Sequence, residues 1–179
     1  MHIFKHFATV VKHKHYVFIH ACKAGIPWQG LWHDMSKFHP VEFFTSAKYF
    51  IGTGSPINVE RKDKGYSKVW MHHSKRNKHH FEYWTDPAPT DNGPGPIKVK
   101  MPLKYVIEMY CDMLAANKVY KGESHTDSDP IAYFRKTEMA GKMHPESAAL
   151  LEKLFLMLED KGEKATFKYI RKLKKQKLY

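Results

Sequence analysis

Hydrophobic and polar positions alternate along most of this chain with the period of an α-helix. Between residues 3 and 24 apolar side chains recur at helical spacing, and Gly25 followed by Pro27 predicts the end of that helix. The same signals predict further helices over about 27 to 37, 40 to 50, 66 to 85, 102 to 120, 129 to 138, 145 to 161 and 163 to 179. We therefore expect an all-α fold, a bundle of about seven or eight helices.

Two segments carry the residues of loops instead. Residues 52 to 65 begin and end with glycine and are rich in charge, and residues 86 to 101 contain four prolines. Both are predicted to lie outside regular structure. The first would suit a lid that contacts a substrate, and an ordinary solvated connection is the alternative.

Length and composition indicate one folded domain over residues 1 to 179. The chain has 179 residues, of which 42% are hydrophobic, and it includes eleven phenylalanines and ten tyrosines. Cys22 and Cys111 lie on predicted apolar helix faces without a neighbouring cysteine, which predicts buried, reduced thiols and a cytoplasmic protein. We see no secretory signal and no apolar run of membrane-spanning length, so we expect no membrane partner.

The formal net charge is +12 with every histidine counted as neutral. Such a charge favours anionic partners electrostatically. Nucleotides, phosphorylated metabolites and nucleic acids all belong to that class, and the charge alone does not choose among them.

The pair His33-Asp34 is the first candidate for chemistry. Consecutive residues of one predicted helical turn point about 100° apart, so both could reach an ion at the edge of the helix. Apolar neighbours on both sides, Leu31, Trp32 and Met35, predict that the aspartate is buried and needs a positive partner. The alternative is a capping or surface pair.

Asp112 is a second candidate, because it interrupts an apolar stripe of the helix predicted over 102 to 120. Its neighbours on that stripe are Tyr105, Met109 and Ala116. A buried carboxylate without a partner is costly or protonated, so we expect Asp112 to bind a metal ion or a basic side chain. Glu108, one turn earlier, would share the site or orient a ligand.

Two histidine doublets, 72–73 and 79–80, lie in the helix predicted over 66 to 85. A continuous helix places His73 and His80 on its core face, two turns or about 10 Å apart, which suits one histidine to each of two ions. His72 and His79 fall on the adjoining side and would replace them if the helix is rotated. Adventitious surface affinity for metal is the alternative for all four.

The order His, His-Asp, His, His, Asp resembles that of the HD superfamily of metal-dependent hydrolases, especially its two-metal members. Lys37, three residues after Asp34, resembles the lysine of the His-Asp-x-x-Lys variant in the HD-GYP branch. The resemblance covers about residues 10 to 120, and helices over 129 to 179, the last strongly basic, would pack on that core. It implies that His13 is the first ligand, because His13, Val17 and Ala21 resemble the opening of the family, with His20 as the alternative.

Together these residues predict a metal-dependent phosphohydrolase. Bound divalent metal would lower the pKa of a coordinated water and polarise a phosphoryl oxygen, with Asp34 as the carboxylate shared between two ions. Lys37 and Arg76 are candidates to neutralise the charge of the phosphate. The predicted ligands of one or two ions are His13, His33, Asp34, His73, His80 and Asp112, and this mixed set suits iron, manganese, cobalt, nickel or zinc.

The expected substrate is a nucleotide or another small phosphorylated compound. Two other functions stay open. One is an HD-type oxygenase that uses two irons for oxygen-dependent cleavage. The other is a basic protein associated with nucleic acid, in which the metal is structural and the lysines of the last helix follow the phosphates.

Overall fold

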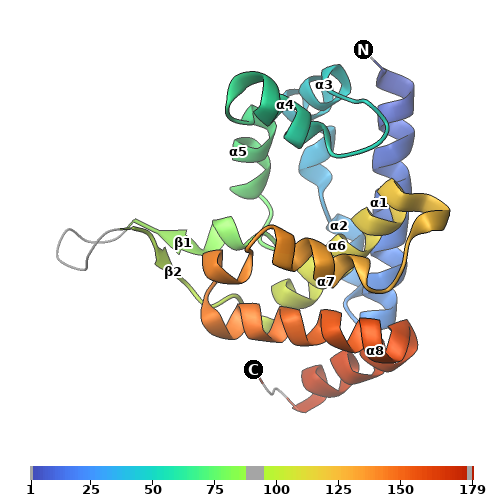
Figure 1. Ribbon diagram of the computed structural model, residues 1–179, viewed down its shortest axis with the longest axis vertical. Helices are drawn as coiled ribbons and strands as arrows, with labels where there is room; N and C mark the ends of the chain where they lie inside the picture. Colours follow the sequence, from blue (N-terminus) through green and yellow to red (C-terminus); the bar gives the residue numbers. More distant parts are fainter. Residues whose placement is uncertain (1, 88–94, 177–178) are drawn as a thin grey trace.

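The computed structural model describes residues 2–87, 95–176 and 179 (Figure 1). Its helices are α1 (Ile3–Ala24), α2 (Pro27–Trp32), α3 (Pro40–Lys48), α4 (Pro56–Lys64), α5 (Lys68–Ser74), α6 (Leu103–Lys121), α7 (Asp129–Lys136) and α8 (Pro145–Gln176). Short 3-10 turns lie at η1 (Met35–Phe38), η2 (Phe81–Trp84), η3 (Gly122–Ser124) and η4 (Ala140–Lys142). The expected all-α fold is confirmed.

The hydrophobic core lies where α1, α7 and α8 pack around α6. Helix α6 contacts both α1 and α8, and α7 also packs on α8. Consecutive residues of α6 from Val106 to Ala115, except Asp112, are buried, so this helix is covered on several sides. The ring of Tyr110 lies 5.4 Å from that of Phe155 in this core. This packing fixes the middle of α6, from which Glu108 and Asp112 project.

Helix α8 contains a sharp kink at Gly162, where the prediction has one helix end and another begin. The backbone there has φ 71° and ψ 175°, a conformation that glycine adopts easily. After the kink, Nη1 of Arg171 donates to the carbonyl of Lys23 at 2.6 Å, and the ammonium of Lys174 binds the carbonyl of Gly25. Two cations of the basic helix therefore satisfy carbonyl groups at the end of α1.

Three predicted elements differ from the structure. The helix predicted over 27 to 37 ends at Trp32, and the loop predicted over 52 to 65 contains α4. The last five residues of helix α4 are all charged, so an apolar helical period does not reveal it. It is anchored by the buried Glu60, whose carboxylate accepts bonds from Ser67 Oγ at 2.7 Å and from the backbone N–H of Val69 at 3.2 Å.

The helix predicted over 66 to 85 ends at Ser74. The side-chain amide of Asn77 donates to the carbonyl of His73 at 2.8 Å, and the backbone N–H of the same residue donates there at 3.1 Å. The backbone bond is a last bond of the helical type, whereas the side-chain bond competes for the same carbonyl and favours an end of the helix here. The chain therefore turns and reaches η2 by a separate segment.

The segment predicted as a loop over 86 to 101 includes the end of one short strand and the whole of a second. Strands β1 (Thr85–Asp86) and β2 (Ile97–Lys98) pair antiparallel, with Thr85 opposite Lys98, and residues 88–94 between them lie outside the described part.

Both cysteines are free thiols. Cys111 is buried as expected, whereas Cys22 is exposed, because it lies on the outer side of α1. Among the described residues, none of the helices combines the length and apolar character that crossing a bilayer requires.

Candidate metal centre

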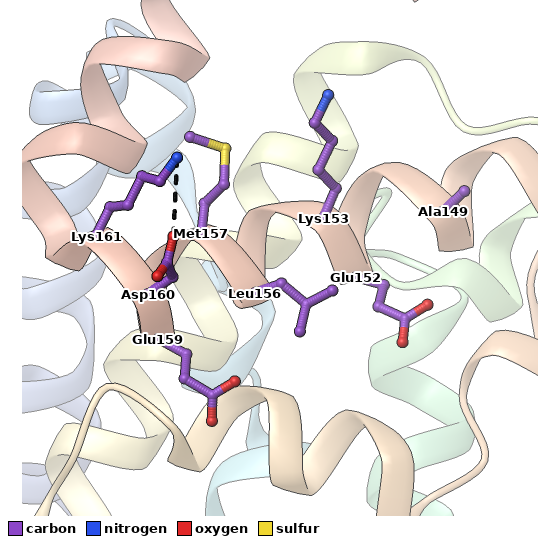
Figure 2. A pocket seen from close by; sticks show the side chains of 8 residues that line it. All are labelled: Ala149, Glu152, Lys153, Leu156, Met157, Glu159, Asp160 and Lys161. Atoms are coloured by element: carbon purple, nitrogen blue, oxygen red, sulfur yellow. Dashed lines mark ion pairs between the residues drawn. The ribbon is translucent and has the colours of Figure 1, made fainter.

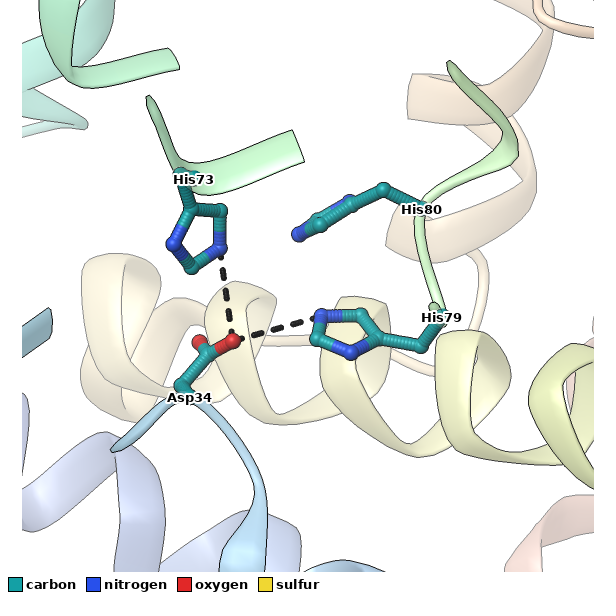
Figure 3. A group of neighbouring side chains, drawn as sticks. All are labelled: Asp34, His73, His79 and His80. Atoms are coloured by element: carbon teal, nitrogen blue, oxygen red, sulfur yellow. Dashed lines mark ion pairs between the residues drawn. The ribbon is translucent and has the colours of Figure 1, made fainter. Parts of the chain in front are cut away.

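Two groups of metal-ligand side chains meet between α1, α2, α5 and α6, and both include Asp34. The first group is His13, His33, Asp34 and Asp112, and the second is Asp34, His73, His79 and His80. Within each group the candidate ligand atoms lie within 4.8 Å of one another. Figure 3 shows the second group, with the three imidazole rings and the Asp34 carboxylate turned toward a common centre.

The two oxygens of Asp34 face different groups. Oδ2 lies 3.1 Å from Nε2 of His33 and 3.7 Å from Nε2 of His13. Oδ1 lies 3.3 Å from Nε2 of His73 and 3.3 Å from Nε2 of His79. One carboxylate thus presents one oxygen to each group, which is how a carboxylate bridges two ions.

Asp112 completes the first group from α6. Its Oδ1 lies 3.0 Å from Nε2 of His13 and 3.4 Å from Nε2 of His33. Its Oδ2 lies 3.8 Å from Nε2 of His79 in the second group. The predicted inward position of Asp112 on its helix brings it to the cluster.

The backbone at residues 33 and 34 turns both side chains inward. His33 ends α2 with φ −54° and ψ 131°, and Asp34 is left-handed with φ 54° and ψ 30°. Aspartate is one of the few residues that adopt this conformation at modest cost. Both side chains are buried, whereas Trp32 and Met35 on either side are exposed. The prediction that His33 and Asp34 lie in one helical turn is therefore wrong, because neither residue has the backbone angles of a right-handed helix.

Two buried carboxylates hold the outer nitrogens of the histidines. Oε1 of Glu108 lies 3.1 Å from Nδ1 of His33 and 3.2 Å from Nδ1 of His79. Oε2 of Glu42 lies 2.8 Å from Nδ1 of His73. An Nδ1–H that donates to a carboxylate leaves Nε2 free to bind a cation. Each of these three imidazoles is fixed in the tautomer that a metal ligand requires.

Several buried atoms of the cluster make no hydrogen bond in the described structure. They are Nε2 of His13, His33, His79 and His80, and both carboxylate oxygens of Asp34. Buried polar atoms are nearly always paired in folded proteins, so a convergent set of unpaired donors and acceptors requires an explanation. A bound cation supplies one, because it accepts the lone pairs of all of them.

The charges of the site agree with that explanation. Burial alone would raise the pKa of Asp34, but His33 and Lys37 hold it well below its ordinary value. Burial would also raise the pKa of Glu108, and the bonds from His33 and His79 lower it to about 2. Burial, together with His79 and His73, keeps the pKa of His80 well below the usual value, so this imidazole is neutral. Ionised carboxylates and a neutral His80 are in the forms that bind metal. Burial would lower the pKa of His33 and of His73, but Asp34 raises it, so a metal ion would have to displace a proton from these two imidazoles.

All six predicted ligands lie in the cluster, and His79 joins them. The prediction assigned His79 to an adjoining helix face. Because the chain leaves the helix after Ser74, both residues of the second doublet turn inward. In the sequence, Asn77 could have indicated this early end of the helix, because an asparagine side chain competes for backbone hydrogen bonds.

The other predicted residues take different positions. His20 stands apart, with Nδ1 3.4 Å from the carbonyl of Cys111, and His72 lies outside the ligands, with Nδ1 2.5 Å from Glu42 Oε1. Arg76 is exposed and donates to the carbonyl of His72 at 3.1 Å. The structure therefore does not bring Arg76 to the cluster.

Lys37 lies on the side of the cluster that reaches solvent. Its Nζ is 2.6 Å from Oδ2 of Asp34, an ion pair without hydrogen-bond geometry. The side chains of Lys37 and Asp112 are 27% and 14% exposed, more than those of the other ligands.

A separate pocket of about 460 Å³ lies on the surface of α8 (Figure 2). Its lining includes Glu152, Lys153, Asp160 and Lys161, so it carries both signs of charge, and Lys161 pairs with Asp160 at 3.8 Å. It includes no residue of either ligand group. We therefore do not connect it with the chemistry of the cluster.

The fold and the site define an all-α protein with a buried cluster of histidines and carboxylates. The family DUF5662, described as a family of unknown function, matches residues 2–157, and the chain belongs to that family. The matched range contains both ligand groups. The chain has no match among curated proteins and none among solved structures.

Proposed function

We propose that this protein is a metal-dependent phosphohydrolase of the HD type, and that its cluster binds two divalent transition-metal ions. The observation that carries the proposal is the carboxylate of Asp34, which offers one oxygen to each of two ligand groups. A first group of two imidazoles and two carboxylates, and a second of three imidazoles and one carboxylate, suit iron, manganese, cobalt, nickel or zinc.

Metal bound there would lower the pKa of a coordinated water toward neutrality and polarise a phosphoryl oxygen. Glu108 and Glu42 keep the imidazoles oriented, and Asp34 and Asp112 balance the positive charge. Lys37, at the more exposed side, is placed to pair with a phosphate oxygen as well as with Asp34. Arg76 would have to leave its bond to the carbonyl of His72 to join it.

The proposed substrate is a nucleotide or another small phosphorylated compound. The net charge of +12 favours an anion, and Lys37 gives that anion a specific cationic partner beside the cluster. The two free thiols suit a reducing compartment, and we propose the cytoplasm.

The test begins with elemental analysis of protein purified without an affinity tag, followed by a screen for phosphate release from nucleotides and phosphate esters. Asp34→Asn keeps a residue that tolerates the left-handed backbone but removes the bridging charge. We expect it to lose both ions and all phosphate release. Asp160→Asn, an exposed carboxamide substitution on α8, is the matched control and should retain both.

Retention of the metal by Asp34→Asn and by Asp112→Asn would refute the proposed site. Two other results would replace the proposed reaction. Oxygen consumption by an iron-loaded protein without phosphate release would favour an oxygenase. Binding of nucleic acid that collapses with added salt, again without phosphate release, would favour a nucleic-acid-associated protein.

A further inference from the structure

The outer side of α1 is apolar. At about 100° per residue, Phe4, Phe7, Val11 and Phe18 fall within roughly 60° of the circumference. All four are exposed, and Phe4 is 89% exposed. The opposite side of α1 carries the buried residues, which are His6, Val10, His13, Val17, His20, Ala21 and Ala24. The helix therefore turns His6, His13 and His20 inward and its phenylalanines outward, and His15 is exposed.

Helix α2 and the η1 turn extend this apolar surface. Trp28 and Trp32, one turn apart, are 74% and 66% exposed. The ring of Phe38 lies 6.3 Å from that of Phe7. Gly30 lets α2 approach α1 closely, because a Cβ there would meet Phe18. We call this surface the aromatic face, and its residues are Phe4, Phe7, Val11, Phe18, Trp28, Leu31, Trp32, Met35 and Phe38.

The residues of the aromatic face lie on adjoining elements at the outside of the molecule. Figure 1 shows α1 running along one edge of the fold, and α1 and α2 pack directly on each other. A contiguous exposed apolar surface with several large aromatic residues is uncommon on a soluble monomer and marks a site of interaction.

The exposed charged side chains within residues 2–41 are all positive. Between residues 2 and 41 the sequence contains one carboxylate, Asp34, and that side chain is buried. Lys5 and Lys12 are exposed and lie on one side of the apolar stripe by helical spacing. On the other side, Nζ of Lys14 lies 3.5 Å from Sδ of Met35. The face is thus aromatic at its centre and cationic at its borders.

These charges decide between possible occupants. A second copy of the chain would bring lysines against lysines, and the exposed part of residues 2–41 offers no carboxylate to pair with them. A bilayer surface with anionic headgroups complements both properties. Tryptophan and phenylalanine side chains favour the interfacial region, while lysines reach the headgroups.

We propose that the aromatic face docks this protein on membrane surfaces that contain anionic lipid. The contact is peripheral, so it is compatible with the absence of a membrane-spanning helix from the described residues. It revises the expectation of no membrane partner, which considered only segments that cross the bilayer. The proposal does not depend on whether the cluster holds metal.

Flotation of the full chain with lipid vesicles tests this proposal. One set of vesicles contains phosphatidylcholine alone, and the other also contains phosphatidylglycerol. We expect binding to the second set only, weakened by added salt, with a blue shift of tryptophan fluorescence. The double variant Trp28→Ser and Trp32→Ser should bind on the order of tenfold more weakly, and Lys12→Glu at least about fivefold more weakly.

Two variants outside the aromatic face serve as controls. Tyr66→Ser removes an aromatic side chain that is 56% exposed, and Lys172→Glu reverses an exposed charge on α8. Both should bind as the unaltered protein does, and circular dichroism should confirm that every variant is folded. The proposal is overturned if the protein does not bind anionic vesicles, or if the tryptophan variant binds them unchanged. Sedimentation that reveals a dimer abolished by the tryptophan variant would assign the face to a second copy instead.

Discussion

Substitution of Glu108 by glutamine should weaken both ions at once, because a single oxygen of this carboxylate orients one histidine of each group. Oε1 lies 3.1 Å from Nδ1 of His33 and 3.2 Å from Nδ1 of His79. Oε2 already accepts from Gln29 Nε2 at 2.8 Å, so the new amide group would meet another donor there. Glutamine therefore removes the charge and also disturbs the position of the side chain.

The size of the effect follows from the bonds that change. A hydrogen bond to a carboxylate contributes about 1 kcal/mol more than one to a neutral amide, which is roughly fivefold in affinity for each ligand so weakened. Losses of about 10- to 100-fold are typical when the outer partner of a metal-binding histidine is changed. We therefore expect Glu108→Gln to lower the affinity of each of two ions by at least about tenfold.

Glu42→Gln is the informative comparison. Glu42 contacts a single ligand, His73 of the second group, through Oε2 and Nδ1. Its other oxygen, Oε1, contacts His72, which is not a ligand. Its replacement should weaken one binding step by about tenfold and leave the other unchanged. Glu152→Gln on α8 lies outside both groups and should leave both steps unchanged.

Calorimetric titration of metal-free protein with a divalent metal resolves the two steps, and circular dichroism checks the fold of each variant. The reasoning is refuted if Glu108→Gln weakens a single step, or if Glu42→Gln and Glu108→Gln behave alike. It is also refuted if the unaltered protein binds one ion in a single step.

Three further changes test separate features. Burial, with Lys118 adding to it, lowers the pKa of His20 to about 4, below that of the unfolded chain. Metal-free protein should therefore lose about 3 kcal/mol of stability as the pH falls from 6.5 to 4, and urea titrations of His20→Gln should show a flatter profile; an unchanged profile would contradict this. Gly30→Ala places a methyl group 2.4 Å from Cβ of Ala21 and should cost about 1 to 3 kcal/mol, whereas Gly54→Ala, in open space, should leave the melting temperature unchanged. Lys37→Met should keep the metal but raise KM for a phosphorylated substrate by about tenfold, and equal KM values for this variant and for the control Lys75→Met would remove the proposed role.

The sequence predicts the long amphipathic helices well. Helices α1 and α6 have a sustained helical period and end at Gly25 and Gly122. Asp112 is recognisable because a carboxylate inside an apolar stripe needs a partner. These features depend on local periodicity and burial, which a single sequence displays.

Other features depend on contacts that periodicity does not reveal. Helix α4 is stabilised by bonds from Glu60 to a following segment, and α5 ends where Asn77 binds back to His73. The inward position of His79 follows from that early end. On α1 both sides of the helix carry bulky residues, so spacing alone does not say that the phenylalanines face outward.

The turn at residues 33 and 34 joins the aromatic face to the buried cluster within four consecutive residues. Trp32 and Met35 point outward from the same short segment that points His33 and Asp34 inward. Lys14 ties this segment to α1 through a bond of 2.5 Å from Nζ to the carbonyl of His33. Trp32 and Met35 of the aromatic face are thus each bonded directly to a residue of the ligand groups, so the outer surface and the metal ligands share one short segment of backbone.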